Sequence, residues 1–329
     1  MQQQRQLGPF RVSALGLGCM NLSHAYGVPP SFDDAQRLLL RALDLGCTLF
    51  DTATLYGFGA NEELVGKVLA PHRRRFTLAS KCGLQGVDGK RVVDGRPATL
   101  KKTCEDSLRR LRTEVIDLYY LHRWDPKVPI EDSVGALSDL VRQGKIQTIG
   151  LSEVSAATLR RAHAVHPITA LQTEYSLWSR NAEIAVLAAC RELGTAFVAF
   201  SPLARGFLTG ALRDVGTLPA DDIRRTMPRF EPAAYAANLK LLGGMAEVAQ
   251  DAGATLAQTA LAWLLAQGEH VLPIPGTANI DHLVENFGTD SVKLSAAQVA
   301  RLDELINQQT VVGPRYNAAA QAGVDTEEF

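Results

Sequence analysis

Four side chains capable of acid, base or hydrogen-bond chemistry lie at the ends of short apolar segments, or just beyond them. Asp51 directly follows one segment and Tyr56 lies five residues further on, while Lys81 closes a second segment and His122 follows a third. A lone histidine or lysine in such a place is more often a satisfied structural group than a catalyst. The four together favour a catalytic cluster, because the carboxyl ends of parallel strands meet at one face of an α/β barrel.

These residue types suit the reduction of a carbonyl group. Hydride transfer to a carbonyl carbon needs a proton donor for the developing alkoxide, and a tyrosine, with an ordinary pKa of about 10, donates more readily beside a fixed cation. Lys81 is the candidate cation, and Asp51 is the anion that keeps a buried lysine charged and oriented. We therefore predict Tyr56 as the general acid and His122 as a hydrogen-bond donor to the substrate oxygen.

The composition is that of a globular protein with little net charge. The 329 residues include 34 Lys and Arg and 35 Asp and Glu, a formal net charge of -1, and 46% are hydrophobic. Such a balance produces no global field that attracts nucleic acid or an anionic membrane. The apolar fraction supports a core without help from metal or disulfides. We expect neither nucleic acid nor a membrane as a partner.

The cysteines and the apolar segments indicate a reducing compartment. The five cysteines are odd in number and scattered without CxxC spacing, so we predict buried thiols and no metal site. They are Cys19, Cys47, Cys82, Cys104 and Cys190. The first ten residues contain no apolar signal core, and no stretch approaches the roughly 18 apolar residues that span a bilayer. We expect a cytoplasmic protein.

Eight short apolar segments, each bounded by turn or polar residues, alternate with helical patterns along the chain. They predict strands at residues 15–20, 47–50, 76–81, 117–121, 146–151, 170–173, 196–200 and 271–274. Strands that alternate with helices form a parallel sheet, and eight such units make a (β/α)8 TIM barrel. Because such barrels often exceed 250 residues as one core, we predict a single α/β domain over residues 1–329.

Two connections and the C-terminal tail are unusually long. The connections 83–98, after strand three, and 204–235, after strand seven, exceed the limit of about 12–15 residues for a structureless loop. In a barrel both rise from the catalytic face, so we expect lids or specificity elements there, with a disordered insertion as the alternative. The tail 311–329 is poorly periodic, and either folds over the substrate mouth or stays mobile.

Two segments suit the phosphates of a nucleotide and a third does not. Gly16-Leu-Gly18 begins like the fingerprint GxGxxG, but Asn21 replaces the third glycine, so we interpret it as a strand packed closely against a neighbour. Barrel phosphate sites gather after strands seven and eight, where unpaired helix amides face the anion. The segments there are Phe-Ser-Pro-Leu-Ala-Arg-Gly at 200–206 and Pro-Ile-Pro-Gly-Thr at 273–277.

The motifs around the four catalytic candidates resemble those of the aldo-keto reductase superfamily. They are Asp-Thr-Ala-Thr-Leu-Tyr-Gly at 51–57, Leu-Ala-Ser-Lys at 78–81 and Leu-Tyr-Tyr-Leu-His at 118–122, and the spacing DTAxxYG is highly specific. The likeness continues at 150–153, 172–177, 200–203 and 274–277, and so covers nearly the whole chain. It implies NADPH-dependent reduction of an aldehyde or ketone to an alcohol, with a tetrad of Asp51, Tyr56, Lys81 and His122.

The resemblance also implies which residues hold the cofactor. Ser152 and Gln172 match positions that hold the nicotinamide carboxamide, and Phe200 matches the aromatic plate against its ring. Met20 matches a contact near the nicotinamide ribose, and Asp51 is expected to contact the cofactor as well. The pyrophosphate positions are Ser201, Leu203 and Arg205, and those of the adenosine 2'-phosphate and adenine are Gly276, Thr277, His282, Glu285 and Asn286. Pro202, Gly206 and Ile274 are expected as further cofactor contacts.

The match is incomplete in the 2'-phosphate pocket. Ala278 and Asn279 stand where relatives often carry Lys or Arg, and His282 replaces a frequent Arg. A neutral histidine offers one donor and little charge, whereas a guanidinium binds a phosphate through two parallel hydrogen bonds. We predict a modest preference for NADPH, with NADH also accepted.

The candidate substrate contacts are Met20, Tyr26 and Trp124, which lie beside the catalytic cluster and suit the walls of a flat apolar cleft. Trp124 equally fits a residue that caps the barrel core. The segments His24-Ala-Tyr-Gly, Met-Pro-Arg-Phe at 227–230 and Gly-Pro-Arg-Tyr at 313–316 are similar to the pyridoxal-reductase and auxin-induced-protein branch of the superfamily. That likeness implies aromatic or small aliphatic aldehydes as substrates.

Two other functions use the same residues. The β subunits of voltage-gated potassium channels resemble this fold and keep its cofactor site, so a non-catalytic NADP(H)-binding regulatory subunit is one alternative. The intact tetrad argues against it. An alcohol or sugar dehydrogenase is the other alternative, with Tyr56 ionised as the base. Cellular cofactor ratios decide between the two directions of reaction.

Overall fold

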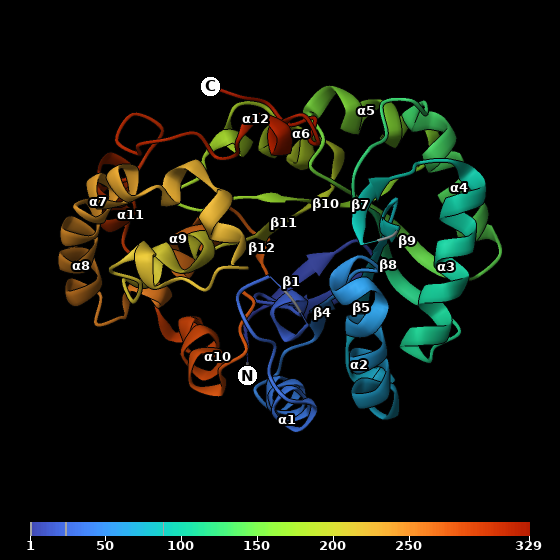
Figure 1. Ribbon diagram of the computed structural model, residues 1–329, viewed down its shortest axis with the longest axis horizontal. Helices are drawn as coiled ribbons and strands as arrows, with labels where there is room; N and C mark the ends of the chain where they lie inside the picture. Colours follow the sequence, from blue (N-terminus) through green and yellow to red (C-terminus); the bar gives the residue numbers. More distant parts are fainter. Residues whose placement is uncertain (1, 24, 88) are drawn as a thin grey trace.

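The computed structural model describes residues 2–23, 25–87 and 89–329, and its centre is an eight-stranded parallel sheet (Figure 1). The strands, in sheet order, are β3 (Leu17–Gly18), β4 (Leu49–Asp51), β5 (Thr77–Cys82), β8 (Ile116–Leu121), β9 (Ile146–Ser152), β10 (Ile168–Glu174), β11 (Ala196–Phe200) and β12 (Val271–Pro273). All eight predicted strands are present, and the (β/α)8 prediction is confirmed. His24, in one of the quoted segments, lies outside the described residues.

The first and last strands close the sheet into a barrel. Gly18 forms a parallel bridge with Gly276, and the Gly16 amide donates to the Pro273 carbonyl oxygen at 3.0 Å. A Cβ atom at Gly18 would lie 3.0 Å from the Ile274 carbonyl oxygen, so a side chain there would push the two strands apart. The interpretation of Gly16-Leu-Gly18 as a strand packed closely against a neighbour is therefore confirmed.

Helices surround the sheet (Figure 1). Those that follow the barrel strands in turn are α1 (Phe32–Asp44), α2 (Ala60–Leu69), α3 (Pro97–Leu111), α4 (Ile130–Arg142), α5 (Ala156–Val165), α6 (Val186–Leu193), α9 (Leu256–Ala266) and α10 (Ile280–Phe287). Two further helices, α7 (Pro232–Leu239) and α8 (Leu241–Asp251), precede α9, and α11 (Ala296–Leu305) and α12 (Ala318–Gln321) follow the barrel.

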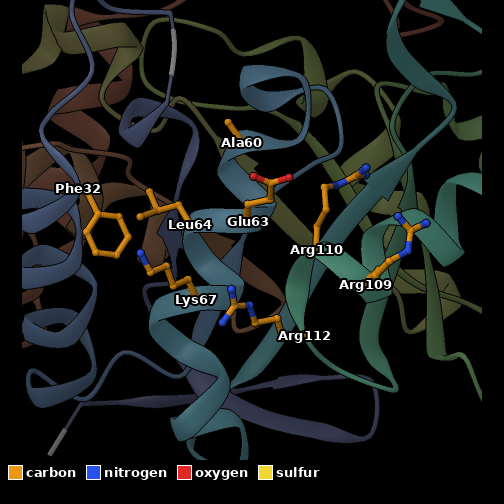
Figure 2. A pocket seen from close by; sticks show the side chains of 8 residues that line it. All are labelled: Phe32, Ala60, Glu63, Leu64, Lys67, Arg109, Arg110 and Arg112. Atoms are coloured by element: carbon orange, nitrogen blue, oxygen red, sulfur yellow. The ribbon is translucent and has the colours of Figure 1, made fainter.

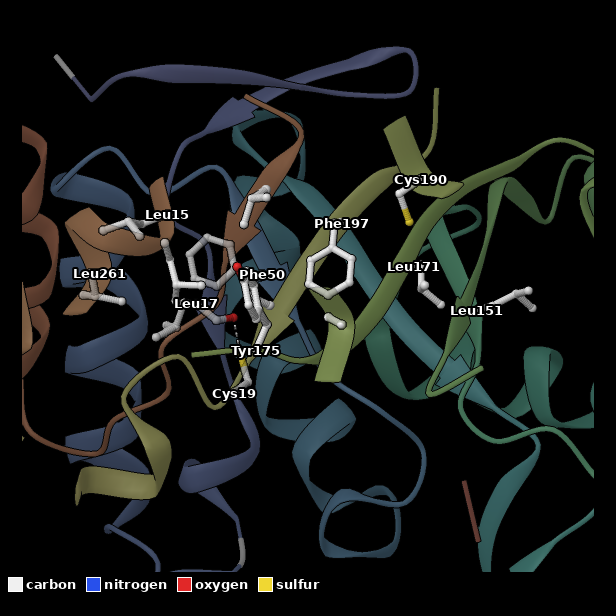
Figure 3. Packing of buried hydrophobic residues seen from close by; sticks show 14 of the residues in the cluster. Leu15, Leu17, Cys19, Phe50, Leu151, Leu171, Tyr175, Cys190, Phe197 and Leu261 are labelled. Atoms are coloured by element: carbon white, nitrogen blue, oxygen red, sulfur yellow. Dashed lines mark hydrogen bonds between the residues drawn. The ribbon is translucent and has the colours of Figure 1, made fainter. Parts of the chain in front are cut away.

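Successive residues of each barrel strand face opposite sides of the sheet. Leu49 and Val198 belong to the apolar cluster inside the barrel, whereas Phe50 and Phe197, their neighbours in the sequence, pack in the larger cluster under the helices. Figure 3 shows part of that outer cluster. Because the alternation has a period of two, a polar residue two positions after an inward-facing one points into the barrel mouth.

Two hairpins extend the barrel. β1 (Gln4–Leu7) and β2 (Phe10–Ser13) pair antiparallel, and Leu7 and Val12 join the inner apolar cluster. The Ser13 amide donates to the Thr48 hydroxyl at 2.7 Å, which places this hairpin at the amino-terminal end of β4. It is absent from the predicted strands. The long connection 83–98 contains the second hairpin, β6 (Leu84–Val87) and β7 (Lys90–Val93), and short 3-10 turns make up half of 204–235.

The five cysteines are buried free thiols, as predicted. Within the described ranges, no helix is long and apolar enough to cross a bilayer. The same ranges contain no group of three or more side chains arranged to hold a metal ion.

One buried charge ties the second barrel unit to the third. The Glu62 side chain of α2 is 0% exposed, accepts from the Ser80 hydroxyl at 2.5 Å and makes an ion pair with Arg110 of α3 at 2.7 Å. An ionised carboxylate in the interior needs such a partner. Arg109, the residue before Arg110 on α3, pairs with Asp106 at the surface instead.

We expect Arg110→Met to lower the free energy of unfolding by about 3 to 5 kcal/mol, because the variant leaves the Glu62 carboxylate buried without its cation. Arg109→Met is the matched control: it removes the same charge from an exposed pair and should lower that free energy by less than about 1 kcal/mol. Urea unfolding measures both. If both variants lost the same free energy of unfolding, the role of Arg110 as the essential partner of buried Glu62 would be contradicted.

Candidate active site

Three of the predicted catalytic side chains meet at the carboxyl ends of β4 and β5. The Lys81 ammonium makes an ion pair with Asp51, donates to the Thr52 carbonyl oxygen at 2.9 Å and lies 3.4 Å from the Tyr56 hydroxyl. The Lys81 side chain is 0% exposed and that of Asp51 is 3% exposed. Asp51 and Lys81 each lie two positions after a residue that faces the barrel interior, so both side chains point into the barrel mouth, where they meet.

Tyr56 reaches the cluster from a turn at the start of η2 (Tyr56–Gly59). Asn61, in the first turn of α2, holds the surrounding segment in place. Its side-chain amide donates to the Cys19 carbonyl oxygen at 2.8 Å and to the Ser23 hydroxyl at 2.7 Å, and it accepts from the Thr52 hydroxyl at 2.6 Å. The turn that carries the phenol is thus tied to the loop after β3.

Burial and charge together set the protonation of this group. Burial raises the pKa of Tyr56 above its ordinary value of 10.0, and the positive charge of Lys81 offsets only part of that effect. Burial acts to lower the pKa of Lys81, but the Asp51 carboxylate and the Tyr56 hydroxyl outweigh it, so this pKa is raised. At neutral pH Tyr56 therefore keeps its proton and Lys81 its charge.

His122 packs edge-to-face against Tyr56, with ring centroids 5.8 Å apart and an interplanar angle of 87°. Its Nδ1 atom is buried and has no hydrogen-bond partner among the described residues. Burial, followed by the charges of Arg123, Lys81 and Arg91, lowers the pKa of His122 well below its usual value. The ring is therefore neutral at neutral pH, with one nitrogen as donor and the other as acceptor.

Three residues of the predicted nicotinamide site end adjacent strands beside this cluster. Gln172 of β10 donates to the second carboxylate oxygen of Asp51 at 2.8 Å. Ser152 ends β9 and accepts from Arg123 at 3.2 Å, and Phe200 ends β11 at the edge of the inner apolar cluster. A hydroxyl, an amide and an aromatic ring on neighbouring strand ends suit a flat ligand that carries a carboxamide.

The turn after β11 has the backbone of an anion site. Ser201, Ala204 and Arg205 have φ values of 47°, 51° and 57°, and Gly206 has φ of 92°. Left-handed residues beside right-handed ones orient successive backbone amides toward one concavity, a geometry typical of phosphate-binding turns. Pro202 and Leu203 lie between them. The pyrophosphate role of this segment stays a prediction.

The segment after β12 turns into α10 as expected, but its first amides are not free. The Asn279 side chain accepts from the amides of Asp281 at 2.7 Å and His282 at 3.2 Å. The expectation of unpaired amides is therefore wrong for these two groups, because asparagine is itself a good helix cap. The Thr277 hydroxyl contacts the Asn279 backbone, accepting from its amide at 3.0 Å, whereas His282 is exposed.

The other predicted cofactor contacts of this segment lie around the same turn. Ile274 packs in the inner apolar cluster, and Gly276 forms the bridge that closes the barrel. Glu285 and Asn286 lie on α10, where Asn286 is buried. Their contacts with a nucleotide stay predictions.

Glu174, the last residue of β10, binds two arginines. Its Oε2 lies 3.0 Å from Nη2 of Arg205 and 2.9 Å from Nε of Arg315, and Arg315 also contacts Glu153 at 2.6 Å. Burial acts to raise the pKa of Glu174, but Arg205 and Arg315 outweigh it and lower this pKa to about 2. Arg205, predicted to contact the pyrophosphate, is therefore engaged by a carboxylate in this structure.

These ion pairs anchor the C-terminal tail to the barrel mouth. Further along, the Asp325 amide donates to the Glu153 carbonyl oxygen at 3.0 Å, and the Asp325 carboxylate accepts from the Ser155 hydroxyl at 3.0 Å. Glu327 accepts from the Ala156 amide at 2.7 Å. Figure 1 shows α12 and the C-terminus beside α5 and α6. The tail thus packs on the barrel, and its action as a lid stays a prediction.

Two of the predicted substrate contacts lie on the catalytic face. Met20 packs against the small apolar cluster that contains Tyr56 and Leu84. The Tyr26 hydroxyl accepts from Arg205 at 3.3 Å. Met20 therefore lies beside the predicted acid, whereas Tyr26 belongs to the group of residues around Glu174.

Trp124 is oriented toward the helix layer. Its indole nitrogen donates to the Val128 carbonyl oxygen at 2.9 Å, and its ring centroid lies 5.9 Å from the Arg161 guanidinium carbon on α5. These contacts fit the interpretation that it caps the core. Its role as a substrate contact stays a prediction.

The residues that sequence reasoning missed at the mouth are mostly charged. Glu174 follows Gln172 by two positions in the inward register of β10, so the strand pattern contained a signal for it. Arg123 directly follows His122, and its contact with Ser152 depends on how two strand ends lie. Arg315 had no local signal, because its partners are 141 and 162 residues away.

A hollow of about 490 Å³ lies elsewhere, on the outside of the barrel between α1, α2 and α3 (Figure 2). It is lined by Phe32, Ala60, Glu63, Leu64, Lys67, Arg109, Arg110 and Arg112. It contains none of the predicted site residues. This basic hollow is therefore separate from the catalytic cluster.

Comparisons with known proteins agree with this geometry. The model of the Aldo/keto reductase family matches residues 14–307. The chain is 43% identical to the Schizosaccharomyces pombe aldo-keto reductase yakc, whose name specifies NADP(+), over 96% of this chain and 95% of that protein. It is 44% identical to a protein from Glycine max named probable aldo-keto reductase 1, over 93% and 89% of the two chains.

Solved structures of aldo-keto reductases are also similar to this chain. The glycerol dehydrogenase AKR11B4 from Gluconobacter oxydans superposes with a TM-score of 0.86 at 30% identity, covering 96% of this chain and 99% of that one. An aldo/keto reductase from Klebsiella pneumoniae in complex with NADP and acetate has a TM-score of 0.73 at 28% identity, with coverage of 96% and 99%.

The neutral state of His122 makes stability depend on pH. Its pKa is far below normal in the folded protein and about 6.5 in the unfolded chain, so below pH 6.5 only the unfolded chain binds this proton. Stability should therefore fall as the pH falls. Between pH 7.5 and 5.5 this group should remove about 1.4 kcal/mol from the free energy of unfolding.

Urea unfolding of the wild type and of His122→Asn at these two pH values tests this expectation. The asparagine variant lacks the titrating ring, so its loss of stability between the two pH values should be smaller by that amount. The same pH dependence in both proteins would mean that His122 is protonated as easily when folded as when unfolded.

Proposed function

Because the chain belongs to the aldo/keto reductase family, we propose that it reduces the carbonyl group of an aldehyde or ketone to an alcohol with NADPH, and that Tyr56 is the general acid. The observation that carries the proposal is the buried Lys81 ammonium, which lies between the Asp51 carboxylate and the Tyr56 hydroxyl.

Tyr56 has the properties of a proton donor. Burial raises its pKa, so the phenol holds its proton at neutral pH until a substrate oxygen gains negative charge. When the proton leaves, the phenolate lies beside the fixed positive charge of Lys81, which lowers the energy of that state. Asp51 keeps Lys81 charged at a position where the ammonium is not exposed to solvent. Solvent then restores the proton to Tyr56.

His122 orients the substrate in this proposal. Its ring is neutral, so it donates one hydrogen bond to the carbonyl oxygen and adds no charge that competes with Tyr56 for it. Two donors on one oxygen fix the direction of the carbonyl group. The carbonyl carbon is thereby presented to the nicotinamide side of the site.

NADPH is the proposed cofactor, and the residues present fit it. Ser152, Gln172 and Phe200 suit the nicotinamide, the left-handed turn after β11 suits the pyrophosphate, and Thr277 and His282 suit the 2'-phosphate. When bound, the reduced nicotinamide supplies the hydride. The name of the yakc protein and the NADP in the Klebsiella pneumoniae complex support the phosphorylated form.

The alternatives fit these residues less well. A regulatory subunit that only binds NADP(H) has no use for the buried Lys81–Asp51 pair beside Tyr56. A dehydrogenase needs the Tyr56 phenolate as base, and the raised pKa keeps that form scarce at neutral pH. The glycerol dehydrogenase among the similar structures uses the oxidative direction by its name. In that direction Tyr56 would act as the base, and its rate would rise with pH.

We expect Tyr56→Phe to lower kcat for aldehyde reduction by about 10²–10⁴-fold, because the variant lacks the proton donor. NADPH oxidation with 4-nitrobenzaldehyde, pyridoxal, methylglyoxal and simple aldoses measures the loss. NADPH binding, followed by fluorescence, should change little. Tyr235→Phe is the control, since it removes the same hydroxyl from a tyrosine that donates to Leu212 away from the site. Wild-type rates in the Tyr56 variant would refute the proton-donor assignment.

The cofactor preference should depend on His282. We expect the kcat/KM ratio of NADPH to NADH to stay below a thousandfold in the wild type, and His282→Arg to raise it on the order of tenfold, because a guanidinium pairs with a phosphate through two hydrogen bonds. The comparison is steady-state kinetics with both cofactors, and His72→Arg, at the other end of the barrel, is the control. An unchanged ratio would show that His282 does not face the 2'-phosphate.

A further inference from the structure

Arg123 lies between two parts of the proposed site. It follows His122 at the end of β8, and its Nη1 donates to the His122 carbonyl oxygen at 2.7 Å and to the Ser152 hydroxyl at 3.2 Å. Its guanidinium therefore crosses from the end of β8 to the end of β9, between the predicted catalytic histidine and a predicted nicotinamide contact. The side chain is partly buried there.

Two other arginines at the mouth have carboxylate partners, which Arg123 lacks within the described ranges. Arg205 and Arg315 both pair with Glu174, and Arg315 pairs with Glu153 as well. No carboxylate among the described residues lies within ion-pair distance of Arg123. A partly buried cation next to a reaction centre without an anionic partner indicates that a ligand supplies the anion.

The free atoms of Arg123 have the geometry of a carboxylate site. Both of its hydrogen bonds start from Nη1, and Nε and Nη2 make none to the described residues and are not among the buried unpaired atoms. Nε and Nη2 form one edge of the planar guanidinium, with two parallel N–H bonds. That edge matches the two oxygens of a carboxylate.

The charge of Arg123 affects the pKa values of two catalytic groups. It contributes, after burial, to lowering the pKa of His122, and it is among the charges that oppose the burial effect on Tyr56. Asp51 compensates Lys81 but lies in an ion pair with that residue alone. Next to the catalytic cluster, the positive charge of Arg123 is therefore not paired with a carboxylate of the described residues.

We propose that Arg123 binds a carboxylate on the substrate, and that the protein prefers carbonyl compounds that carry one. This inference rests on the proposed reductase function and narrows its substrate class. One accessible guanidinium edge suits a carboxylate better than a phosphate dianion, because the latter needs further donors. Binding through Arg123 also orients the carbonyl, since the anchoring group is adjacent to the hydrogen-bond donor His122.

A matched pair of aldehydes tests the proposal. 4-Carboxybenzaldehyde and methyl 4-formylbenzoate share the ring and the para substituent, and only the former is charged. With NADPH, the wild type should show a kcat/KM for the acid at least tenfold above that for the ester. Arg123→Met should reduce this ratio at least tenfold, mainly through a higher KM for the acid, and Arg123→Lys should keep part of it.

Two controls separate this role from others. Arg74→Met removes the same charge in η3 (Ala70–Arg75), before β5 at the opposite end of the barrel, and should leave the ratio unchanged. If Arg123 only oriented the Ser152 hydroxyl, Arg123→Met would weaken NADPH binding and lower turnover of acid and ester equally. That result, or a wild type that reduces both aldehydes equally well, would overturn the inference and leave the reductase function intact.

Calorimetry measures binding of a carboxylate at Arg123 directly, without any catalytic turnover. The protein loaded with NADP+ should bind benzoate at least tenfold more tightly than benzamide, and Arg123→Met should abolish the difference. Failure of the wild type to reduce either aldehyde would count against the reductase function, and the benzoate measurement would still decide the anion site. If wild type and Arg123→Met bound benzoate equally tightly, the proposal of a carboxylate site at Arg123 would be overturned.

Discussion

The burial of one ammonium group constrains the whole barrel mouth. Lys81 has no exposed side-chain surface, and in such a place a lysine without a counter-charge would lose its proton or destabilise the fold. Asp51 supplies that charge, the Thr52 carbonyl accepts a second hydrogen bond, and Gln172 occupies the other carboxylate oxygen. Because Lys81 and these partners come from the ends of three strands, β4, β5 and β10, the folded barrel holds the cation in place beside Tyr56.

A second charged group organises the opposite side of the mouth. Glu174 holds Arg205 of the connection after β11 and Arg315 of the C-terminal tail, so one buried carboxylate contacts both segments, which also meet through hydrogen bonds such as that from Arg229 to the Gly313 carbonyl oxygen. Its pKa is lowered to about 2, so the carboxylate stays ionised at neutral and mildly acidic pH. Beside the predicted catalytic groups, the Arg123 guanidinium has no carboxylate partner among the described residues.

Strand periodicity explains why much of the site was predictable. Asp51, Lys81 and Gln172 each lie two positions after an inward-facing residue, and resemblance assigned their roles before any contact was known. The β1–β2 hairpin was not predicted, because its stability comes from covering the barrel interior with Leu7 and Val12. The expectation of free amides in α10 failed because Asn279 caps them.

Spacing alone therefore determined the barrel, the face on which the polar strand ends lie, and the types of group that gather there. A local pattern specifies the direction of a side chain relative to its own strand or helix, since that follows from backbone geometry. It does not specify which distant charge a side chain meets. Two features follow from how the connections cross the mouth, which only the packed tertiary structure decides: the pairing of Glu174 with Arg315, 141 residues away, and the lack of a carboxylate partner for Arg123 in the described part of the chain.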